Sequence, residues 1–168
     1  MPHPPKPIIG VMGPGQFASE IDLANAFALG QRIAQQEWIV LCGGRKAGVM
    51  DAVCRGAKSA GGQTIGILPG DNRAGMSESV DIPIVTGMGN ARNNINVLTS
   101  DVVIACGIGA GTASEVALAL KANKNVILLT ENETSRQFFK NLYPEKVTVI
   151  KSPAEAIELA GAILSIKE

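Results

Sequence analysis

The sequence predicts an α/β protein built on a Rossmann-like, doubly wound parallel sheet of about seven strands. Short apolar segments rich in β-branched residues recur along the chain, most gaps between them hold a helical pattern, and glycine clusters follow several of them. Because a helix carries the chain back across the sheet between two parallel strands, this alternation indicates a parallel sheet. With 168 residues, 46% of them hydrophobic, the chain can form one core but hardly two. We therefore expect a single domain over residues 1–168, with residues 1–7 as a flexible N-terminal arm.

The first part of the chain contains three predicted strands and two predicted helices. Residues 8–12 form an apolar strand, and residues 21–35 follow with helical periodicity. Residues 39–42 are a second strand, residues 49–60 a second helix and residues 64–68 a third strand. These elements form two successive strand–helix–strand units.

The middle of the chain begins with a polar segment, residues 69–81, which fits neither the helical nor the strand periodicity. We expect a surface loop beside the functional site there. A strand over residues 82–86 and a helix over residues 91–100 follow. Residues 102–106 are wholly apolar, as in a central parallel strand, and residues 112–122 form an alanine- and leucine-rich helix.

The last part of the chain adds strands over residues 126–129 and 147–150 and helices over residues 134–141 and 153–166. The final helix has a clear start signal. Ser152 is a favourable N-cap, and Pro153 suits the first helical position because its missing N–H would be unpaired there in any case.

Glycine clusters follow four of the predicted strands, within residues 10–15, 42–51, 86–93 and 106–115. Parallel sheets bind ligands beyond the carboxyl ends of their strands. Residues 106–115 are the most informative, because a buried strand, a glycine turn and a helix start meet there. Glycines allow an anion to approach backbone N–H groups at the positive end of the helix dipole. One such cluster is equally explained as a sharp strand-to-helix turn, but four at one edge indicate a phosphate-binding rim.

Charged residues occur at three of these turns. Arg92 begins a helix, where a cation is unfavourable, so a ligand phosphate or Glu115 should compensate it. Thr112 and Glu115 also have the spacing of a capping box. Glu115 is therefore explained equally well as a helix cap and as a functional carboxylate. Arg45 and Lys46 either add positive charge to the rim or form a solvated turn.

Several function classes are disfavoured. A P-loop requires Ser or Thr after the lysine, and Ala47 follows Lys46. The first turn lacks the glycine spacing of NAD-binding proteins, so no NAD is expected, and the only histidine, His3, lies in the arm, which argues against a Ser-His-Asp triad. Fifteen basic residues balance fifteen acidic ones, so neither nucleic acid nor an anionic membrane is an expected partner.

No apolar run reaches membrane-spanning length, and no secretory signal precedes the first strand, which predicts a cytoplasmic protein. Cys42, Cys54 and Cys106 lack metal-ligand spacing. We expect buried, reduced thiols and no structural metal, with a soft ligand contact at Cys42 or Cys106 as the alternative.

At these turns the chain resembles the lonely-guy (LOG) and lysine-decarboxylase-like Rossmann superfamily. That pattern has a Gly-Gly turn before Gly-x-Met, an arginine-bearing helix and then Pro-Gly-Gly-x-Gly-Thr-x-x-Glu. The matching residues are Gly43, Gly44, Gly48, Met50, Arg92, Gly109, Gly111, Thr112 and Glu115. The resemblance implies the fold and, as one alternative, a phosphoribohydrolase that cleaves the N-glycosidic bond of a nucleoside 5′-monophosphate. In that enzyme Arg92 would orient the nucleotide, and Glu115 would stabilise an oxocarbenium-like centre or activate water.

The chain departs from the LOG pattern in three places. Gly107 and Ile108 replace Pro-Gly, Asn93 replaces a lysine, and Ser114 replaces the first residue of a Glu-Glu pair. With these departures it resembles more the branch of the superfamily that contains the molybdenum cofactor (Moco) carrier proteins. This resemblance implies a carrier, not an enzyme, that holds a phosphorylated molybdopterin as cargo.

The resemblance also implies where the cargo binds. Its phosphate would rest on the N–H groups of residues 109–112, and its molybdenum end would meet the turns at residues 13–15 and 43–45, without a protein ligand for the metal. The loop of residues 70–80 is a candidate cover. The expected binding residues are Gly13, Pro14, Gly15, Gly43, Gly44, Arg45, Arg92, Gly107, Ile108, Gly109, Ala110, Gly111, Thr112 and Glu115. Expected partners are molybdoenzymes or cofactor-synthesis proteins, and a homodimer or homotetramer is expected, with the helix of residues 112–122 as one possible interface.

Overall fold

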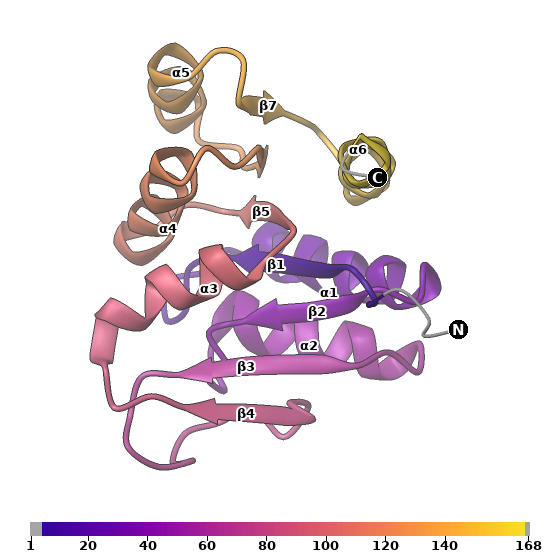
Figure 1. Ribbon diagram of the computed structural model, residues 1–168, viewed down its shortest axis with the longest axis vertical. Coiled ribbons are helices and arrows are strands. Elements are labelled where there is room, and N and C mark those ends of the chain that lie inside the picture. The colour runs from indigo at the N-terminus through magenta and orange to yellow at the C-terminus, as the bar shows by residue number, and fades with distance from the viewer. Residues whose placement is uncertain (1–4, 167–168) are drawn as a thin grey trace.

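The computed structural model describes residues 5–166 and places a parallel sheet between two layers of helices (Figure 1). Within that range the sheet has seven strands in the order β4-β3-β2-β1-β5-β6-β7. All neighbouring strands run parallel, which confirms the predicted doubly wound sheet. The strands are β1 (Ile8–Met12), β2 (Ile39–Cys42), β3 (Thr64–Leu68), β4 (Ile82–Val85), β5 (Val102–Cys106), β6 (Val126–Leu129) and β7 (Val147–Val149).

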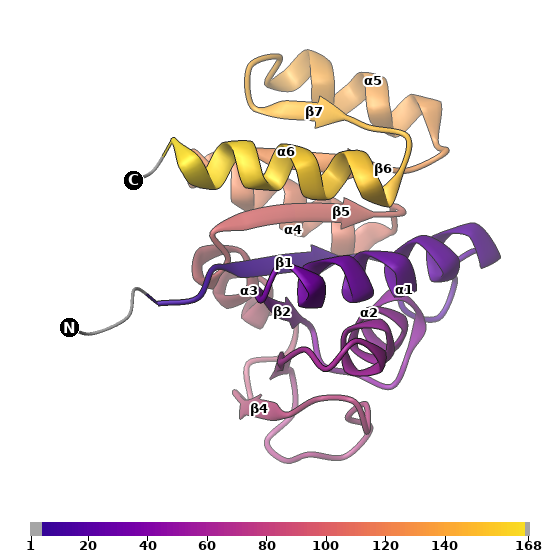
Figure 2. The same ribbon diagram turned by 90° about the vertical axis from the view of Figure 1, so that its right-hand side faces the viewer.

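Helices cover both faces of the sheet (Figure 2). Buried residues of α1, α2 and α6 pack on one face, and buried residues of α3, α4 and α5 pack on the other. The helices are α1 (Glu20–Gln35), α2 (Gly48–Ser59), α3 (Asn93–Thr99), α4 (Ala110–Lys121), α5 (Glu133–Leu142) and α6 (Pro153–Ser165). A short 3-10 helix, Gly89–Arg92, leads into α3, so the predicted helix over residues 91–100 begins as a tighter turn.

Side-chain caps fix the start of three helices. Ser19 and Asp22 form a capping box at α1. Asn132 caps α5 by accepting a hydrogen bond from the Ser135 N–H. Ser152 caps α6 with Pro153 in its first turn, as the sequence predicted.

The chain reverses its direction of travel through the sheet between β1 and β5. From β1 it proceeds outward to β4, and it then returns to the far side of β1 to form β5. Met12 and Ala105 are register partners near the carboxyl ends of these two central strands. In open α/β sheets such a switch point leaves a crevice beyond the strand ends, because the loops that follow the two strands turn to opposite faces.

Two sequence expectations concern the periphery. The predicted arm, residues 1–7, falls partly outside the described residues, as does His3, and its last residue is already attached to the sheet because the Ile39 N–H donates to the Pro7 carbonyl over 2.9 Å. The predicted surface loop, residues 69–81, packs on the turn after β2, where the Ser77 N–H donates to the Gly44 carbonyl. Within residues 5–166, no helix combines the length and the apolar character needed to cross a membrane.

Candidate functional site

A cavity of about 280 Å³ lies beyond the carboxyl ends of β1, β2 and β5, at the switch point of the sheet. Its walls are the turn after β1, the turn after β2, the start of α3 and the first turns of α4. The four glycine clusters at the strand ends therefore do not scatter over the molecule. Three of the clusters line this cavity with glycines. The fourth, residues 86–93, lines it with the side-chain-bearing residues Asn90, Arg92 and Asn93.

Most of the predicted binding residues line this cavity. The structure places there Gly13, Pro14, Gly15, Gly43, Arg45, Arg92, Ile108, Gly109, Ala110, Gly111, Thr112 and Glu115. Gly44 and Gly107 are not among the lining residues. Both have a positive φ, and a Cβ would lie 2.9 Å from the Gly66 Cα at Gly44 and 2.6 Å from the Asp22 carboxyl carbon at Gly107. These two glycines shape the turns behind the cavity wall, where side chains would not fit.

The first turn of α4 forms one wall of the cavity. Its first helical hydrogen bond runs from the Ala113 N–H to the Gly109 carbonyl over 2.8 Å. The N–H groups of Ala110, Gly111 and Thr112 precede that bond and have no helical acceptor. Since they lie at the positive end of the helix dipole, this wall favours an anion.

Thr112 adds a hydroxyl to the same wall. Its side chain is 1% exposed, and Oγ1 has no hydrogen-bond partner among the described residues. A buried hydroxyl without a partner is costly, so a ligand that hydrogen-bonds it would recover that free energy. The capping box that the Thr-x-x-Glu spacing suggested is wrong: the N-cap of α4 is Gly109, with no side-chain cap, because the helix begins two residues earlier than predicted.

Arg92 is held between the sheet and α3. Its Nε donates to the Ile67 carbonyl over 2.9 Å, and its Nη1 donates to Oδ1 of Asn93. Nη2 lies against Gly43, where a Cβ would be only 2.7 Å away. Burial lowers the pKa of the guanidinium, and the charge of Glu115 opposes that effect. The group stays charged nonetheless, as arginine does in proteins.

Glu115 projects from the second turn of α4 and is 6% exposed. The Asn96 side-chain nitrogen donates to its Oε1 over 2.7 Å. Burial raises the pKa of the carboxyl, and the Asn96 hydrogen bond and the Arg92 charge offset part of the increase. Within residues 5–166 no salt bridge joins Arg92 to Glu115, so the two charges interact across the cavity without direct contact.

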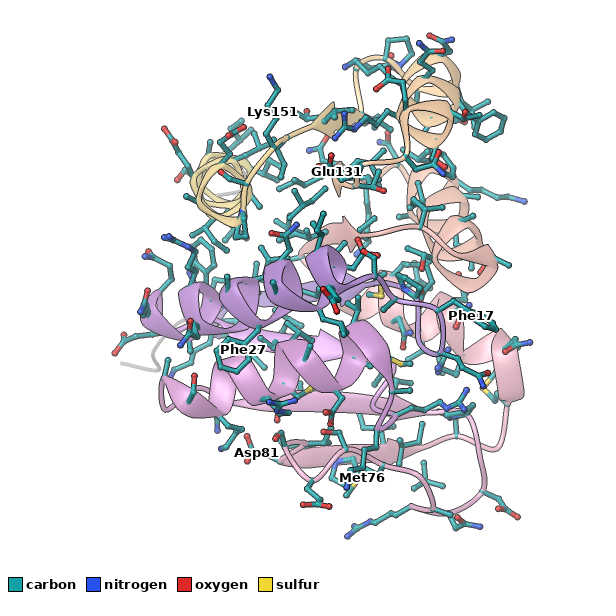
Figure 3. The ribbon with its side chains drawn as sticks, turned by 180° about the vertical axis from the view of Figure 1, so that it is seen from behind. Phe17, Phe27, Met76, Asp81, Glu131 and Lys151 are labelled. Atoms are coloured by element: carbon teal, nitrogen blue, oxygen red, sulfur yellow. The ribbon has the colours of Figure 1, made fainter. Side chains whose placement is uncertain are left out.

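The structure adds lining residues that the sequence analysis did not assign to binding. They are Val11, Met12, Gln16, Phe17, Met50, Asn90 and Asn93. Phe17 is 89% exposed and projects from the loop between β1 and α1, well apart from Met76 of the loop 69–81 (Figure 3). A large exposed aromatic in the first glycine turn was the available signal for this rim.

The structure corrects one further expectation about the rim and decides between two alternatives at another point. No residue of the loop 70–80 lines the cavity, so the expected cover lies beside the site and not over it. Lys46 is directed away into an exposed ion pair with Glu78 at 2.6 Å, whereas Arg45 lines the cavity. The solvated-turn interpretation thus holds for Lys46.

The cysteines are buried and unpaired by disulfides. Cys42 and Cys54 approach to 3.4 Å between their sulfur atoms, beneath the turn after β2. The hydrogen bond from Cys54 lowers the pKa of Cys42, whereas that same bond and burial raise the pKa of Cys54. Neither sulfur lines the cavity, and among the described residues no group of three His, Cys, Asp or Glu side chains is placed to hold a metal ion.

Comparison with solved structures extends over almost the whole chain. The molybdenum cofactor binding protein from the phototrophic bacterium Rippkaea orientalis is 59% identical, with a TM-score of 0.94 over 95% of this chain and 98% of that one. The molybdenum cofactor carrier protein from Chlamydomonas reinhardtii is 52% identical, with a TM-score of 0.91 over 96% and 99% of the two chains. In a comparison of sequences, a protein of Archaeoglobus fulgidus is 43% identical over 121 residues, which are 72% of this chain and 78% of that protein.

The family comparison agrees with the fold and with the resemblance to the LOG-like superfamily. The model of the SLOG cluster 4 family matches residues 6–157, which include every strand and all cavity-lining residues. The motif residues at the ends of β2 and β5 therefore lie within one continuous family match. The chain belongs to the SLOG cluster 4 family.

Proposed function

We propose that this protein is a Moco carrier, which holds a phosphorylated molybdopterin as cargo in the cavity at the switch point. The observation that carries the proposal is the combination of full-length similarity to two proteins described as binding or carrying Moco with a cavity wall suited to an anion. Three backbone N–H groups and the unpartnered Thr112 hydroxyl lie on that wall, and Nη2 of Arg92 lies against Gly43 elsewhere in the cavity lining. They match the phosphate of the cargo, whose remaining part would extend toward the turns after β1 and β2.

A neutral protein suits this role. Helix dipoles and backbone N–H groups hold an anion without a broad basic surface, and the chain has a formal net charge of zero. Enclosure in the cavity would slow the access of water and oxygen to the cargo. The chain's own contribution is to bind, orient and shield.

The test is loading under anaerobic conditions. The purified protein is incubated with Moco released from a molybdoenzyme, passed over a gel-filtration column and analysed for molybdenum and for oxidised pterin fluorescence. We expect both to elute with the protein. Thr112→Val removes the unpartnered hydroxyl at constant volume and should weaken retention about tenfold, whereas Thr134→Val, on the exposed start of α5, should not.

The LOG-like phosphoribohydrolase is the alternative, since Arg92 and Glu115 both line the cavity. It would release free base from AMP, and Glu115→Gln would abolish that release while leaving binding intact. A carrier releases no base. Base release by the wild-type protein without retention of molybdenum would replace the carrier proposal with the hydrolase.

The partners of the carrier are proposed to be molybdoenzymes or cofactor-synthesis proteins, and its assembly a homodimer or homotetramer. Apolar side chains remain exposed on helices at the surface, such as Leu98 of α3 at 53%. A shallow hollow between α3 and α4 includes Ala117 and Leu118. Light scattering coupled to gel filtration measures the assembly, and a monomeric mass would contradict it.

A further inference from the structure

A chain of hydrogen bonds connects Arg92 to the first turn of α4. Nη1 of Arg92 donates to Oδ1 of Asn93, and Nδ2 of Asn93 donates to Oγ of Ser114 over 2.9 Å. The Ser114 hydroxyl donates in turn to the Gly111 carbonyl over 2.7 Å. The guanidinium is thereby connected to the first turn of α4, which carries the N–H groups of the anion-binding wall.

The amide of Asn93 has one orientation that suits both neighbours. Its oxygen must face Arg92, which can only donate, and its nitrogen must face the Ser114 oxygen, whose hydrogen is directed to Gly111. The reverse orientation would place an NH₂ group against a guanidinium. Asn93 and Arg92 are both buried, so water cannot easily replace the contact between them, whereas Ser114 is exposed.

The acceptors of Arg92 are neutral. The Ile67 carbonyl and the Asn93 amide oxygen fix two of its nitrogen atoms, and Nη2 has no acceptor among the described residues. A carboxylate at either place would have neutralised the guanidinium at close range. Neutral oxygens orient the group and leave its charge available to an anion in the cavity.

We propose that Asn93 is a positioning residue. Together with Ser114, it directs Nη2 of Arg92 toward an anion bound at the N–H groups at the start of α4. The identity of the anion as the phosphate of the cargo rests on the proposed function. The positioning of Arg92 does not, because its contacts are made within the chain.

The first measurement therefore needs no ligand. In ¹⁵N NMR spectra, a guanidinium held at Nε and Nη1 rotates slowly about its C–N bonds, so Nη1 and Nη2 of Arg92 should give separate signals. Asn93→Ala should merge them by faster rotation. Asn94→Ala, an exposed neighbour on the same helix, is the matched control and should leave them separate.

The second measurement is the affinity for inorganic phosphate, followed by the shifts of the Gly111 and Thr112 N–H signals in the same samples. Asn93→Ala should weaken binding about tenfold, the loss expected for a misdirected charge-assisted hydrogen bond. Asn93→Asp should weaken binding at least as much, because its carboxylate would pair with Arg92. Ser114→Ala should lose part of the affinity, and Ser114→Thr, which keeps the hydroxyl, should restore it.

A double-mutant cycle separates positioning from packing. In an Arg92→Lys background, Asn93→Ala should change phosphate affinity less than about twofold, because the guanidinium that Asn93 positions is no longer present. An equal loss in both backgrounds would overturn the proposal, as would separate Arg92 signals in Asn93→Ala. If the wild-type protein binds phosphate but retains no Moco, the carrier function fails while the positioning of Arg92 stands.

Discussion

The side-chain nitrogen of Asn96 lies 2.7 Å from Oε1 of Glu115, at the back of the cavity. Asn96 is fully buried on α3, and its Oδ1 has no hydrogen-bond partner among the described residues. One amide hydrogen bond is a small compensation for a carboxylate that is 6% exposed. The pair therefore leaves the ionised form of Glu115 poorly solvated, and burial raises the pKa of its carboxyl.

The first prediction is that Glu115→Gln stabilises the protein in a pH-dependent way. Because the pKa of Glu115 is higher in the folded state, the unfolded chain loses its proton first as the pH rises from about 4.5. The wild type should lose about 1.4 kcal/mol of stability for each unit by which folding raises the pKa. Gln does not ionise, so the variant should become the more stable of the two across that window, with a constant difference above it.

Urea unfolding at a series of pH values between 4 and 8 measures this difference. Glu158→Gln, on the exposed face of α6, is the control and should follow the wild type in parallel. A Glu115→Gln curve that also runs parallel to the wild type would show that Glu115 titrates alike in both states.

The second prediction concerns Gly43, which packs against the guanidinium of Arg92. A Cβ at this position would be 2.7 Å from both Nη2 of Arg92 and Sδ of Met50. Gly43→Ala should therefore displace Arg92 from the cavity wall, weaken phosphate binding, and reduce stability by about 1–3 kcal/mol through overpacking. Calorimetry of phosphate binding and urea unfolding report the two effects.

Gly161→Ala is the matched control for that substitution. Gly161 lies within α6, where the nearest atom to an added Cβ belongs to Trp38 at 3.7 Å, an ordinary contact. Alanine there should stabilise the helix by up to about 1 kcal/mol and leave phosphate binding unchanged. Full phosphate affinity in Gly43→Ala would show that Nη2 does not reach the anion.

The third prediction tests the cap of α6. The Ser152 hydroxyl accepts a hydrogen bond from the Glu155 N–H, and Ser152→Ala should cost about 1 kcal/mol of unfolding free energy. Ser165→Ala removes a hydroxyl at the other end of the helix that donates to the Gly161 carbonyl, and it should cost less because that carbonyl already lies in the helix ladder. Equal losses from the two variants would contradict the assignment of Ser152 as the cap.

The layer architecture could be predicted from the sequence because each element carries a local signal. Residues 102–106 are apolar throughout, and the structure buries all five between two helical layers. The strands over residues 8–12 and 64–68 have the bounds that the sequence predicted. The start of α4 differed by two residues, since Gly109 caps that helix through its backbone alone and leaves no side-chain signal.

The candidate site could be predicted only in outline. The rule that strand ends meet at one edge placed Gly13, Gly43 and Gly109 together, and the structure agrees. The partners of the charged residues depend on how α3 and α4 are rotated against each other, and no local pattern encodes that. Asn93 and Ser114, two separate departures from the LOG pattern, contact each other across 21 positions in the chain.

The last prediction is that the three thiols resist alkylation in the native protein. Cys42, Cys54 and Cys106 are 0% exposed, and burial raises the pKa of Cys106 to about 12. Iodoacetamide at pH 8 should label them at least about 100-fold more slowly than in guanidinium chloride, since the thiolate and access are both required. Mass spectrometry after tryptic digestion identifies each site. Hydrogen bonds from Cys54 and the Gly44 N–H lower the pKa of Cys42, but α2 encloses that sulfur. Rapid labelling of Cys42 alone in the native protein would mean that the contact between β2 and α2 opens readily.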